Sequence, residues 1–329
     1  MPEGFRIATY NIENLDDEIA GEEFDARLAA LRPMLARIDA DILCLQEVDA
    51  QPRNRAPRRP RALERLIDAT PYAGFDLACS EPEPGHGPMD RHNLAVLSRF
   101  PIVRQRSLRH VLVPPPAHGL PIEAGTAMGK PPAGGVVWDR PIQHVAVKLP
   151  AGRALEIVNL HLRAPLANHI KGGTLAPQIW RSTREWAEGF YVSSLKRIGQ
   201  ALEARLLVES LFDAEPAALI AVAGDFNAES LEMPTRLLRA DVADTGNELL
   251  SNRRLEPVEA RVPLERRFSV RYGARKAMVD HLLVSAGLIE ALAEVEVLNA
   301  DLQDEETAAR LEEPAAASFH APLVARFVL

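Results

Sequence analysis

The sequence has few cysteines and no long hydrophobic run. Among 329 residues there are two cysteines, Cys44 and Cys79, too few for a disulfide framework. Cys44 lies in an apolar stretch, where a thiol is typically inert. No apolar run reaches the length that spans a membrane, and the N-terminal residues lack the basic and apolar regions of a signal peptide. These absences favour a soluble, reducing, cytoplasmic setting without membrane insertion.

An excess of positive charge is also absent. The 38 basic and 46 acidic side chains give a net charge of −8, so the chain as a whole does not attract polyanions. A local patch could still do so, and the run RNRAPRRPR at 53–61 carries five arginines that could follow a phosphate backbone. Its prolines favour an exposed loop, and it lacks the aromatic residues that stack on bases.

Short strands and helices alternate along the chain without a repeat. Hydrophobic patterns predict strands at 5–11, 41–48, 92–98, 141–149, 154–162, 218–224, 267–271, 278–284 and 321–329. Helical periodicity predicts helices at 23–38, 61–69 and 185–211. The Pro- and Gly-rich segment 114–135 is typical of a long loop. Strands joined by hairpins, with helices between them, predict an α/β fold of packed mixed sheets with helices outside, in a single domain over 1–329.

Polar residues stand where the apolar strands end. They are Asn11, Glu13, Glu47, His161, Asp225, Asn227, Asp280, His281 and His320. Taken singly, each has a structural explanation as a turn former, a surface carboxylate or a satisfied core histidine. Taken together, strands that end in carboxylate, amide or imidazole predict one site rich in hard oxygen ligands beside histidines. That composition suits Mg²⁺ or Mn²⁺.

The stretch LIAVAGDFNAES at 219–230 shows this pattern on a single strand. An apolar run that ends at Gly224 predicts a core strand opening into a loop. Residues two apart on an extended chain point to the same side. Asp225 and Asn227 should therefore face one cleft, while Phe226 packs the other way.

The order of the motifs resembles that of a known superfamily. TYNIENL, LQEVD, LAVLSRFPI, VNLHL, AGDFNA, VDHLLVS and SFHAP are similar, in this order, to motifs of the endonuclease/exonuclease/phosphatase superfamily. That group includes pancreatic-type deoxyribonucleases, abasic-site endonucleases, bacterial sphingomyelinases and inositol polyphosphate 5-phosphatases. The resemblance runs from about residue 5 to the end of the sequence. It implies a four-layer α-β-β-α sandwich and the metal-dependent hydrolysis of phosphate esters.

The resemblance also implies a metal side of the site. Glu47 stands where the family has its principal metal carboxylate, and Asn11 would position the metal or the attacked phosphate. Glu13 stands where some nucleases carry a second acid. Family members commonly have Ser-Asp-His before the last strand, whereas this chain has Phe319 in the middle position. Phenylalanine cannot bind a metal, which leaves open whether one or two ions bind.

The catalytic side follows from the same resemblance. His161 would donate a hydrogen bond to a phosphate oxygen, and Asp225 and Asn227 would hold the water and the phosphate. Asp280 would orient His320, the general base. An imidazole can take a proton from water near neutral pH, and a carboxylate behind it fixes its tautomer. Water would then attack phosphorus directly, without a covalent intermediate.

Four further residues are candidates for substrate binding. Arg140 stands where family members often grip the phosphate, although a salt bridge with Asp139 is an equal alternative. His281 is either structural or in contact with the phosphate. His169 and Lys171 belong to a lid-like insertion at about 163–191, which collects cationic and aromatic residues directly after His161.

The sequence therefore predicts a divalent-metal-dependent phosphodiesterase. Small organic or lipid-like diesters are favoured over nucleic acid because of the net charge and the composition of the insertion. A DNA or RNA nuclease is the alternative within enzymes, and a phosphate-binding protein with weak catalysis is the alternative outside them. No obligate protein partner is expected.

Overall fold

The computed structural model describes residues 4–16, 21–51, 57–68, 70–82, 86–118, 135–150, 152–176, 179–311 and 317–329. The strands are β1 (Gly4–Leu15), β2 (Ile42–Val48), β3 (Asp76–Cys79), β4 (Asn93–Ser98), β5 (Ile102–Leu108), β6 (Ile142–Lys148), β7 (Ala154–His161), β8 (Thr174–Ala176), β9 (Ile179–Trp180), β10 (Leu219–Asp225), β11 (Glu256–Pro257), β12 (Val270–Tyr272), β13 (Arg275–Ala277), β14 (Asp280–Val284), β15 (Leu292–Val297) and β16 (Leu323–Val328). The helices are α1 (Glu22–Ile38), α2 (Arg61–Ile67), α3 (Thr183–Ala214), α4 (Met233–Arg239), α5 (Val242–Thr245), α6 (Ala286–Ala291) and α7 (Glu305–Leu311), with 3₁₀ turns η1 (Glu248–Arg253), η2 (Val258–Arg261) and η3 (Leu264–Arg266).

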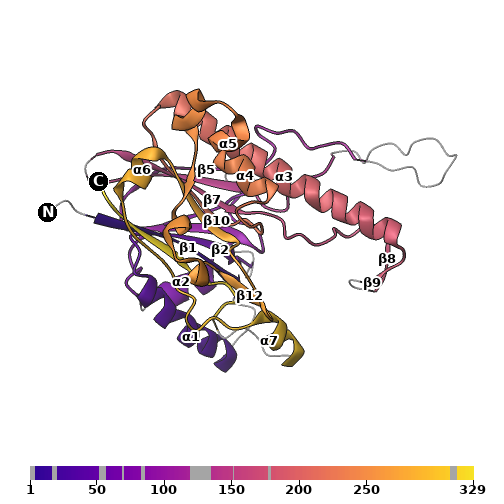
Figure 1. The fold of residues 1–329 in the computed structure, drawn as a ribbon. Coiled ribbons are helices and arrows are strands. Elements are labelled where there is room, and N and C mark those ends of the chain that lie inside the picture. The colour runs from indigo at the N-terminus through magenta and orange to yellow at the C-terminus, as the bar shows by residue number, and fades with distance from the viewer. Residues whose placement is uncertain are drawn as a thin grey trace.

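Two six-stranded sheets pack face to face (Figure 1). The first has the order β15-β16-β1-β2-β4-β3 and the second the order β11-β14-β10-β7-β6-β5. Each is mixed, because β1 and β2 are parallel, as are β7 and β10, while the other pairs are antiparallel. Apolar side chains such as Ile7, Val145 and Leu282 fill the space between the sheets. The predicted packing of two mixed sheets is confirmed.

Helices cover the outer face of each sheet. On the first sheet, α1 packs with one apolar face that includes Phe24, Leu31 and Leu35, and α2 lies beside it. On the second sheet, residues of α3 and α4 enclose another apolar cluster. The layers therefore run α-β-β-α, as the sequence predicted.

Helix α3 is longer than the predicted range 185–211, and only part of it covers the sheet. Its C-terminal half buries Ala204, Leu207 and Leu211 against the second sheet. Its N-terminal half extends beyond the sandwich, with the β8–β9 hairpin at its outer end (Figure 1). Ser182 caps the start by accepting a hydrogen bond from the backbone of Arg184. The insertion at 163–191 therefore contains the hairpin and the first turns of α3.

A buried polar network links the two sheets just inside the strand ends. Gln46 of β2 donates to Asn159 of β7 over 2.8 Å and also bonds Thr9 of β1. Asn159 in turn donates to Gln143 of β6 and to the carbonyl oxygens of Leu45 and Ala95. Every member is satisfied, so the network fixes how one sheet lies over the other. Gln46 adjoins Glu47, and Asn159 lies two residues before His161.

Several elements differ from those that the sequence predicted. Strand β1 continues past residue 11 to Leu15, with a register shift in between. Strand β3 and the short helices α4 and α6 were not predicted, because they are too short for a clear periodicity. Strand β15 was missed although it alternates acidic and apolar residues over 294–297. Most of the predicted loop 114–135 lies outside the described residues. Across the part of the chain that the structure describes, no helix combines the length and apolar character needed to cross a membrane.

Candidate active site

Most of the predicted polar residues meet near the ends of β1, β2, β7 and β10. Asn11 of the first sheet donates a hydrogen bond from Nδ2 to Asp225 Oδ2 of the second sheet over 3.1 Å. The backbone is left-handed at Glu13, Asn14 and Glu47, among other residues near this edge. Such conformations cost free energy in residues other than glycine and are concentrated at functional sites.

Glu47 is held at the end of β2 by two groups from β1. Its carboxylate accepts hydrogen bonds from Asn11 Nδ2 at 3.4 Å and from the backbone N–H of Asn14 at 3.1 Å. Its side chain is 14% exposed, so an oxygen can still reach a ligand. The backbone N–H of Glu13 donates to Asn11 Oδ1, which fixes the amide orientation. The amide nitrogen of Asn11 therefore points toward the carboxylates of Glu47 and Asp225 and bridges them. Its oxygen, which could bind a metal, points to the backbone of Glu13 instead.

The end of β10 has the predicted alternation. Asp225 accepts hydrogen bonds from both the backbone and the side-chain nitrogen of Asn227, while Phe226 is buried in the core beneath α3. Gly224 has a φ of 143°, and a Cβ there would lie 1.9 Å from the carbonyl oxygen of Leu160. Only glycine lets β10 lie this close to β7, which explains the glycine of the GDFN motif.

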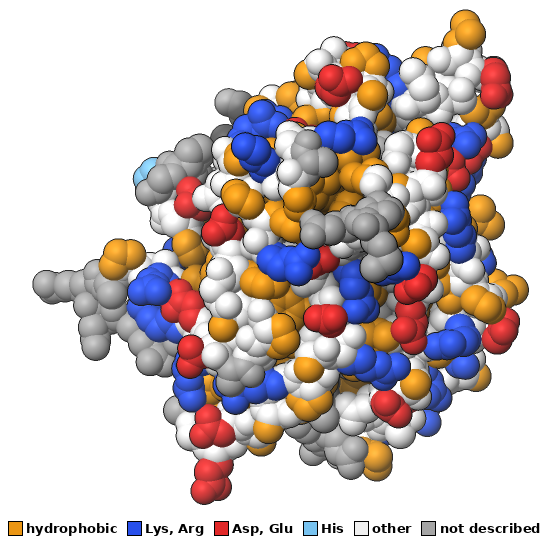
Figure 2. All heavy atoms as spheres, turned by 90° about the vertical axis from the view of Figure 1, so that its left-hand side faces the viewer, with side chains coloured by type: hydrophobic (Ala, Val, Ile, Leu, Met, Phe, Trp, Pro, Cys, Tyr) orange, Lys and Arg blue, Asp and Glu red, His pale blue; other side chains and the backbone are white. Residues whose placement is uncertain are grey.

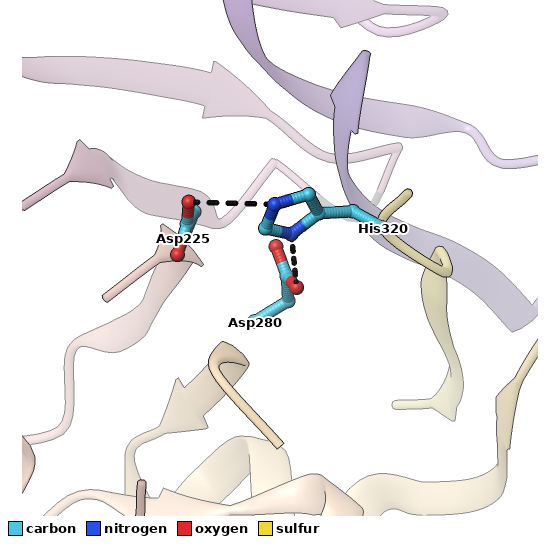
Figure 3. Close-up of side chains that lie close together, drawn as sticks. All are labelled: Asp225, Asp280 and His320. Atoms are coloured by element: carbon cyan, nitrogen blue, oxygen red, sulfur yellow. Dashed lines mark hydrogen bonds and ion pairs between the residues drawn. The ribbon is translucent and has the colours of Figure 1, made fainter. Parts of the chain in front are cut away.

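His320 and Asp280 form a hydrogen-bonded pair (Figure 3). The ring Nδ1 lies 2.8 Å from Asp280 Oδ2, and Nε2 faces Asp225 at 4.0 Å. Glu13 accepts a hydrogen bond from the backbone N–H of Phe319 over 2.8 Å and so anchors the segment that carries His320. One oxygen of Glu13 is thus committed to the chain itself.

His161 lies between two of the carboxylates. Its Nε2 is 3.3 Å from Asp225 Oδ2 and 3.8 Å from Glu47 Oε1. Burial, with the positive charge of Arg140 nearby, lowers the pKa of His161 well below its usual value. The imidazole is therefore neutral and can donate one hydrogen bond to a ligand.

The carboxylates affect one another's titration. Burial is the largest cause that raises the pKa of Asp225, to about 7; the charge of His320 opposes the shift and Asp280 adds to it. Burial alone would lower the pKa of His320, but Asp280 and Asp225 outweigh it and raise that pKa to about 10. The site thus stabilises positive charge.

Arg140 lies just before β6, and Gln200 of α3 donates a hydrogen bond to its carbonyl oxygen. Burial lowers the pKa of Arg140, while Glu47, Asp139 and Asp225 act in the opposite direction. Its Nε is buried without a hydrogen-bond partner among the described residues. Lys196 of α3 bonds Asp139 at 2.5 Å, so the predicted alternative of an Arg140–Asp139 salt bridge is replaced by a Lys196–Asp139 pair.

Glu203 is a positioning residue that the sequence did not reveal. Its fully buried carboxylate accepts hydrogen bonds from Trp138 Nε1 and from three consecutive backbone N–H groups that start at His110. Gln200, one turn earlier, donates to the carbonyl oxygen of Arg140. A glutamate inside a long helix has no sequence signal that separates it from a solvated one.

His92 was also missed. It precedes β4 with a left-handed backbone, and its N–H donates to Asp49. Its Nδ1 lies 3.8 Å from Glu47 Oε2 and has no hydrogen-bond partner within the described chain. The HN pair at 92–93 is typical of the start of a strand, so no local pattern distinguished His92 from a structural residue.

Three of the predicted substrate-binding residues lie apart from this cluster. Both ring nitrogens of His281 are engaged, Nδ1 by Glu259 at 2.5 Å and Nε2 by the carbonyl oxygen of Ala228 at 2.8 Å. The ring is also fully buried. His281 therefore has a structural role, and the predicted alternative, a contact with the phosphate, is wrong. His169 and Lys171 are exposed on the insertion.

The donor set fits a hard divalent cation. Glu47, Asp225 and Asp280 supply carboxylates, and Asp280 Oδ1 is buried without a hydrogen-bond partner in the described residues. Asp225, Asp280 and His320 also offer ligand atoms within 4.8 Å of one another. Neither Cys44 nor Cys79 belongs to the cluster of possible ligands found among the described residues. This composition suits Mg²⁺ or Mn²⁺.

The fold and this cluster of carboxylates and histidines define the protein as an α/β phosphoesterase. A model of the Endonuclease/Exonuclease/phosphatase family matches residues 8–301. The chain belongs to this family, whose members hydrolyse phosphate esters. A search of curated proteins gives no match.

Solved structures share the fold at low sequence identity. Truncated TDP2 from Caenorhabditis elegans is 15% identical, with a TM-score of 0.56, over 99% of this chain and 98% of that one. A mannosyl-6-phosphatase from Bacteroides thetaiotaomicron is 16% identical, with a TM-score of 0.58, over 99% and 100%. An endonuclease/exonuclease/phosphatase family protein from the same bacterium is 16% identical, with a TM-score of 0.58, over 99% and 95%.

Proposed function

We propose that the protein is a divalent-metal-dependent phosphodiesterase that works by direct attack of water. The observation that carries this proposal is the His320–Asp280 pair, which faces Asp225, while Asn11 bridges Asp225 to Glu47 through its amide nitrogen. A base and a metal carboxylate linked through a shared carboxylate are the groups that activation of water and binding of a cation at a phosphate require.

The proton-transfer side uses His320. Its Nδ1 is held by Asp280, so Nε2 is the nitrogen that can take a proton from water. A base must be neutral, whereas the neighbouring carboxylates raise the pKa of His320 to about 10. Bound at Glu47, a divalent cation would neutralise charge on a phosphate oxygen and offset the carboxylates that keep His320 protonated.

The phosphate is held by hydrogen-bond donors around the same point. His161 is neutral and can donate from Nε2, and Arg140 brings a guanidinium whose Nε has no partner in the described chain. Asn227 is held in place by its bonds to Asp225 and to the carbonyl oxygen of Leu162. Donors preorganised in this way stabilise charge as it builds on phosphate oxygens.

A small or lipid-like diester is favoured over nucleic acid. Of the arginine-rich loop, Arg53 and Arg55 lie outside the described residues, whereas Arg59 pairs with Glu64 and Arg61 donates to the carbonyl oxygen of Gln51. On the face that carries the start of β1, the described Lys and Arg side chains are interspersed with Asp and Glu rather than gathered into one basic surface (Figure 2). The contacts of Arg59 and Arg61 within the chain support a compact anionic substrate rather than a nucleic-acid backbone.

A panel of esters assayed with and without Mg²⁺ or Mn²⁺ tests the proposal. It should contain plasmid DNA, RNA, abasic duplex, a bis-aryl phosphate, sphingomyelin and inositol phosphates. We expect metal-dependent hydrolysis of small diesters. Preferred cleavage of DNA or RNA would make the protein a nuclease, and tight phosphate binding without turnover of any ester would make it a binding protein.

A further inference from the structure

A pocket of about 390 Å³ lies in the insertion that follows His161 along the chain. Its walls include Arg163, Leu166, His169, Trp180 and Trp186, so two indole rings and a leucine face a cation and an imidazole. Its volume lies in the range of small-molecule sites, which are mostly apolar with a few polar groups.

The inner end of the pocket is tied to the catalytic cluster. Arg163 follows His161 by two residues, which an extended chain spans in about 7 Å. Leu162, between them, donates its N–H to the carbonyl oxygen of Asp225. The guanidinium of Arg163 bonds Asp139, next to Arg140. A ligand anchored by its phosphate at Arg140 therefore meets Arg163 first.

The pocket then runs outward along α3. At the inner end of the pocket, Lys196 of α3 pairs with Asp139. At the outer end, Gly189 of α3 lies against the Trp180 ring, because a Cβ there would lie 2.9 Å from it. Gly189 and Lys196 are seven helical residues apart, which corresponds to a rise of about 10 Å along α3.

Backbone contacts fix the walls in place. Ser193 Oγ donates to the carbonyl oxygen of Ala164 over 3.1 Å, and the N–H of Asn168 donates to the carbonyl oxygen of Gly189 over 2.8 Å. Trp186 is nevertheless 47% exposed and Leu166 64% exposed, although both line the pocket. Apolar groups held exposed on a fixed frame are typical of a site that an apolar ligand completes.

We propose that this pocket binds the apolar arm of an amphiphilic phosphate diester, at a distance of several bonds from phosphorus. The inference rests on the proposed hydrolase function and names its substrate class. The phosphate lies at Arg140, the linker passes Arg163, and the apolar end lies against Trp180 and Trp186. The aromatic rings supply contact area without requiring one exact ligand shape.

The test is a series of methyl phosphate diesters whose second substituent is an ω-phenylalkyl chain of increasing length. We expect kcat/KM to rise by about fourfold for each methylene buried, and to level off once the ring reaches the tryptophans. Trp186→Ala and Leu166→Ala should flatten this rise while leaving the shortest ester unaffected. Leu249→Ala, an exposed leucine on η1, is the matched control and should change nothing.

A constant kcat/KM along the series, or equal losses on short and long esters in Trp186→Ala, would overturn the pocket assignment while leaving the hydrolase proposal intact. Binding of an ω-phenylalkyl phosphonate, followed by tryptophan fluorescence, separates the two further, because its P–C bond is not hydrolysed. Chain-length-dependent binding without turnover of any ester would support the pocket and refute the hydrolase. Comparing dispersed long-chain esters with the same esters in vesicles shows whether the arm comes from a free amphiphile or a lipid surface.

Discussion

His320 and Asp280 are joined by a 2.8 Å hydrogen bond although they belong to different sheets. Asp280 begins β14 of the second sheet, and His320 lies just before β16 of the first. The pair exists only when the sheets are packed in one relative position, so the candidate base depends on the sandwich core.

Replacing His320 should remove the general base. We expect His320→Ala to lower kcat by roughly 10²–10⁴-fold, the range for loss of a positioned base, with little change in metal affinity. Asp280→Asn should cost less, since it disturbs only the orientation of the ring. Steady-state kinetics on the best ester of the panel gives both values. A kcat in His320→Ala equal to that of the native enzyme would assign the base elsewhere.

Replacing Glu47 should weaken the metal and the activity together. Glu47→Gln keeps the hydrogen bond from the Asn14 N–H but removes the negative charge that attracts a cation. We expect a higher Mg²⁺ concentration for half-maximal activity and a lower maximum, with an unchanged thermal transition. Glu248→Gln, an exposed glutamate on η1, serves as the control. Identical metal titrations for Glu47→Gln and the native protein would refute the metal assignment.

The pKa of His320 should change when a divalent cation binds. In the metal-free protein its pKa is about 10, above the ordinary value of 6.5. The charged pair with Asp280 therefore contributes stability fully below pH 6.5, and that contribution is lost as the pH rises toward 10. Added Mg²⁺ should move the pKa down, because it offsets the carboxylate field. NMR of the ring protons measures the shift, and a pKa that does not respond to Mg²⁺ would contradict the proposed role of the cation.

Glu203 should determine the position of Arg140 through the segment that it holds at Trp138. Glu203→Gln replaces one acceptor oxygen by a donor that faces N–H groups, so we expect a stability loss of about 1–3 kcal/mol. Displacement of the Trp138–Arg140 segment should lower kcat/KM by roughly tenfold to a hundredfold, mainly through KM. Denaturant unfolding and kinetics are measured on Glu203→Gln and on Glu248→Gln, a control at an exposed glutamate of η1. A stability loss without a change in KM would make Glu203 merely structural.

Salt should separate a small-ester hydrolase from a nuclease. An enzyme that grips several backbone phosphates loses roughly 10³-fold or more in affinity over a fourfold rise in salt. We expect KM for the best ester to change little over that range. Arg58→Gln combined with Arg59→Gln should leave it unchanged, whereas shortening 164–184 should be severe. Steep salt dependence together with an essential arginine loop would support the nuclease.

The sequence determined the layers and the chemical character of the site. Alternating and continuous apolar runs specified strands such as β7 and β10, because burial on one or both faces leaves a period that can be read directly. The polar residues that end those strands, Glu47, His161 and Asp225 among them, were identifiable since they interrupt apolar runs. The family motifs then supplied their order.

Tertiary structure decided which of these residues meet and how. Asn11 shows its amide nitrogen, not its oxygen, to Glu47 because the Glu13 N–H occupies that oxygen. His281 is turned away, because β14 alternates sides and leaves it facing Glu259 while Asp280 faces His320. Strand polarity was available from the sequence, but the partners across the strand were not.

The contribution of α3 to the candidate site was the hardest feature to predict from the sequence. Lys196, Gln200 and Glu203 stand at helical spacing and resemble a solvated face, yet they hold the segment from Trp138 to Arg140. Whether a polar helical face meets water or another chain segment depends on contacts between residues more than 50 positions apart. Local sequence determines the helix, and long-range packing determines what the helix positions.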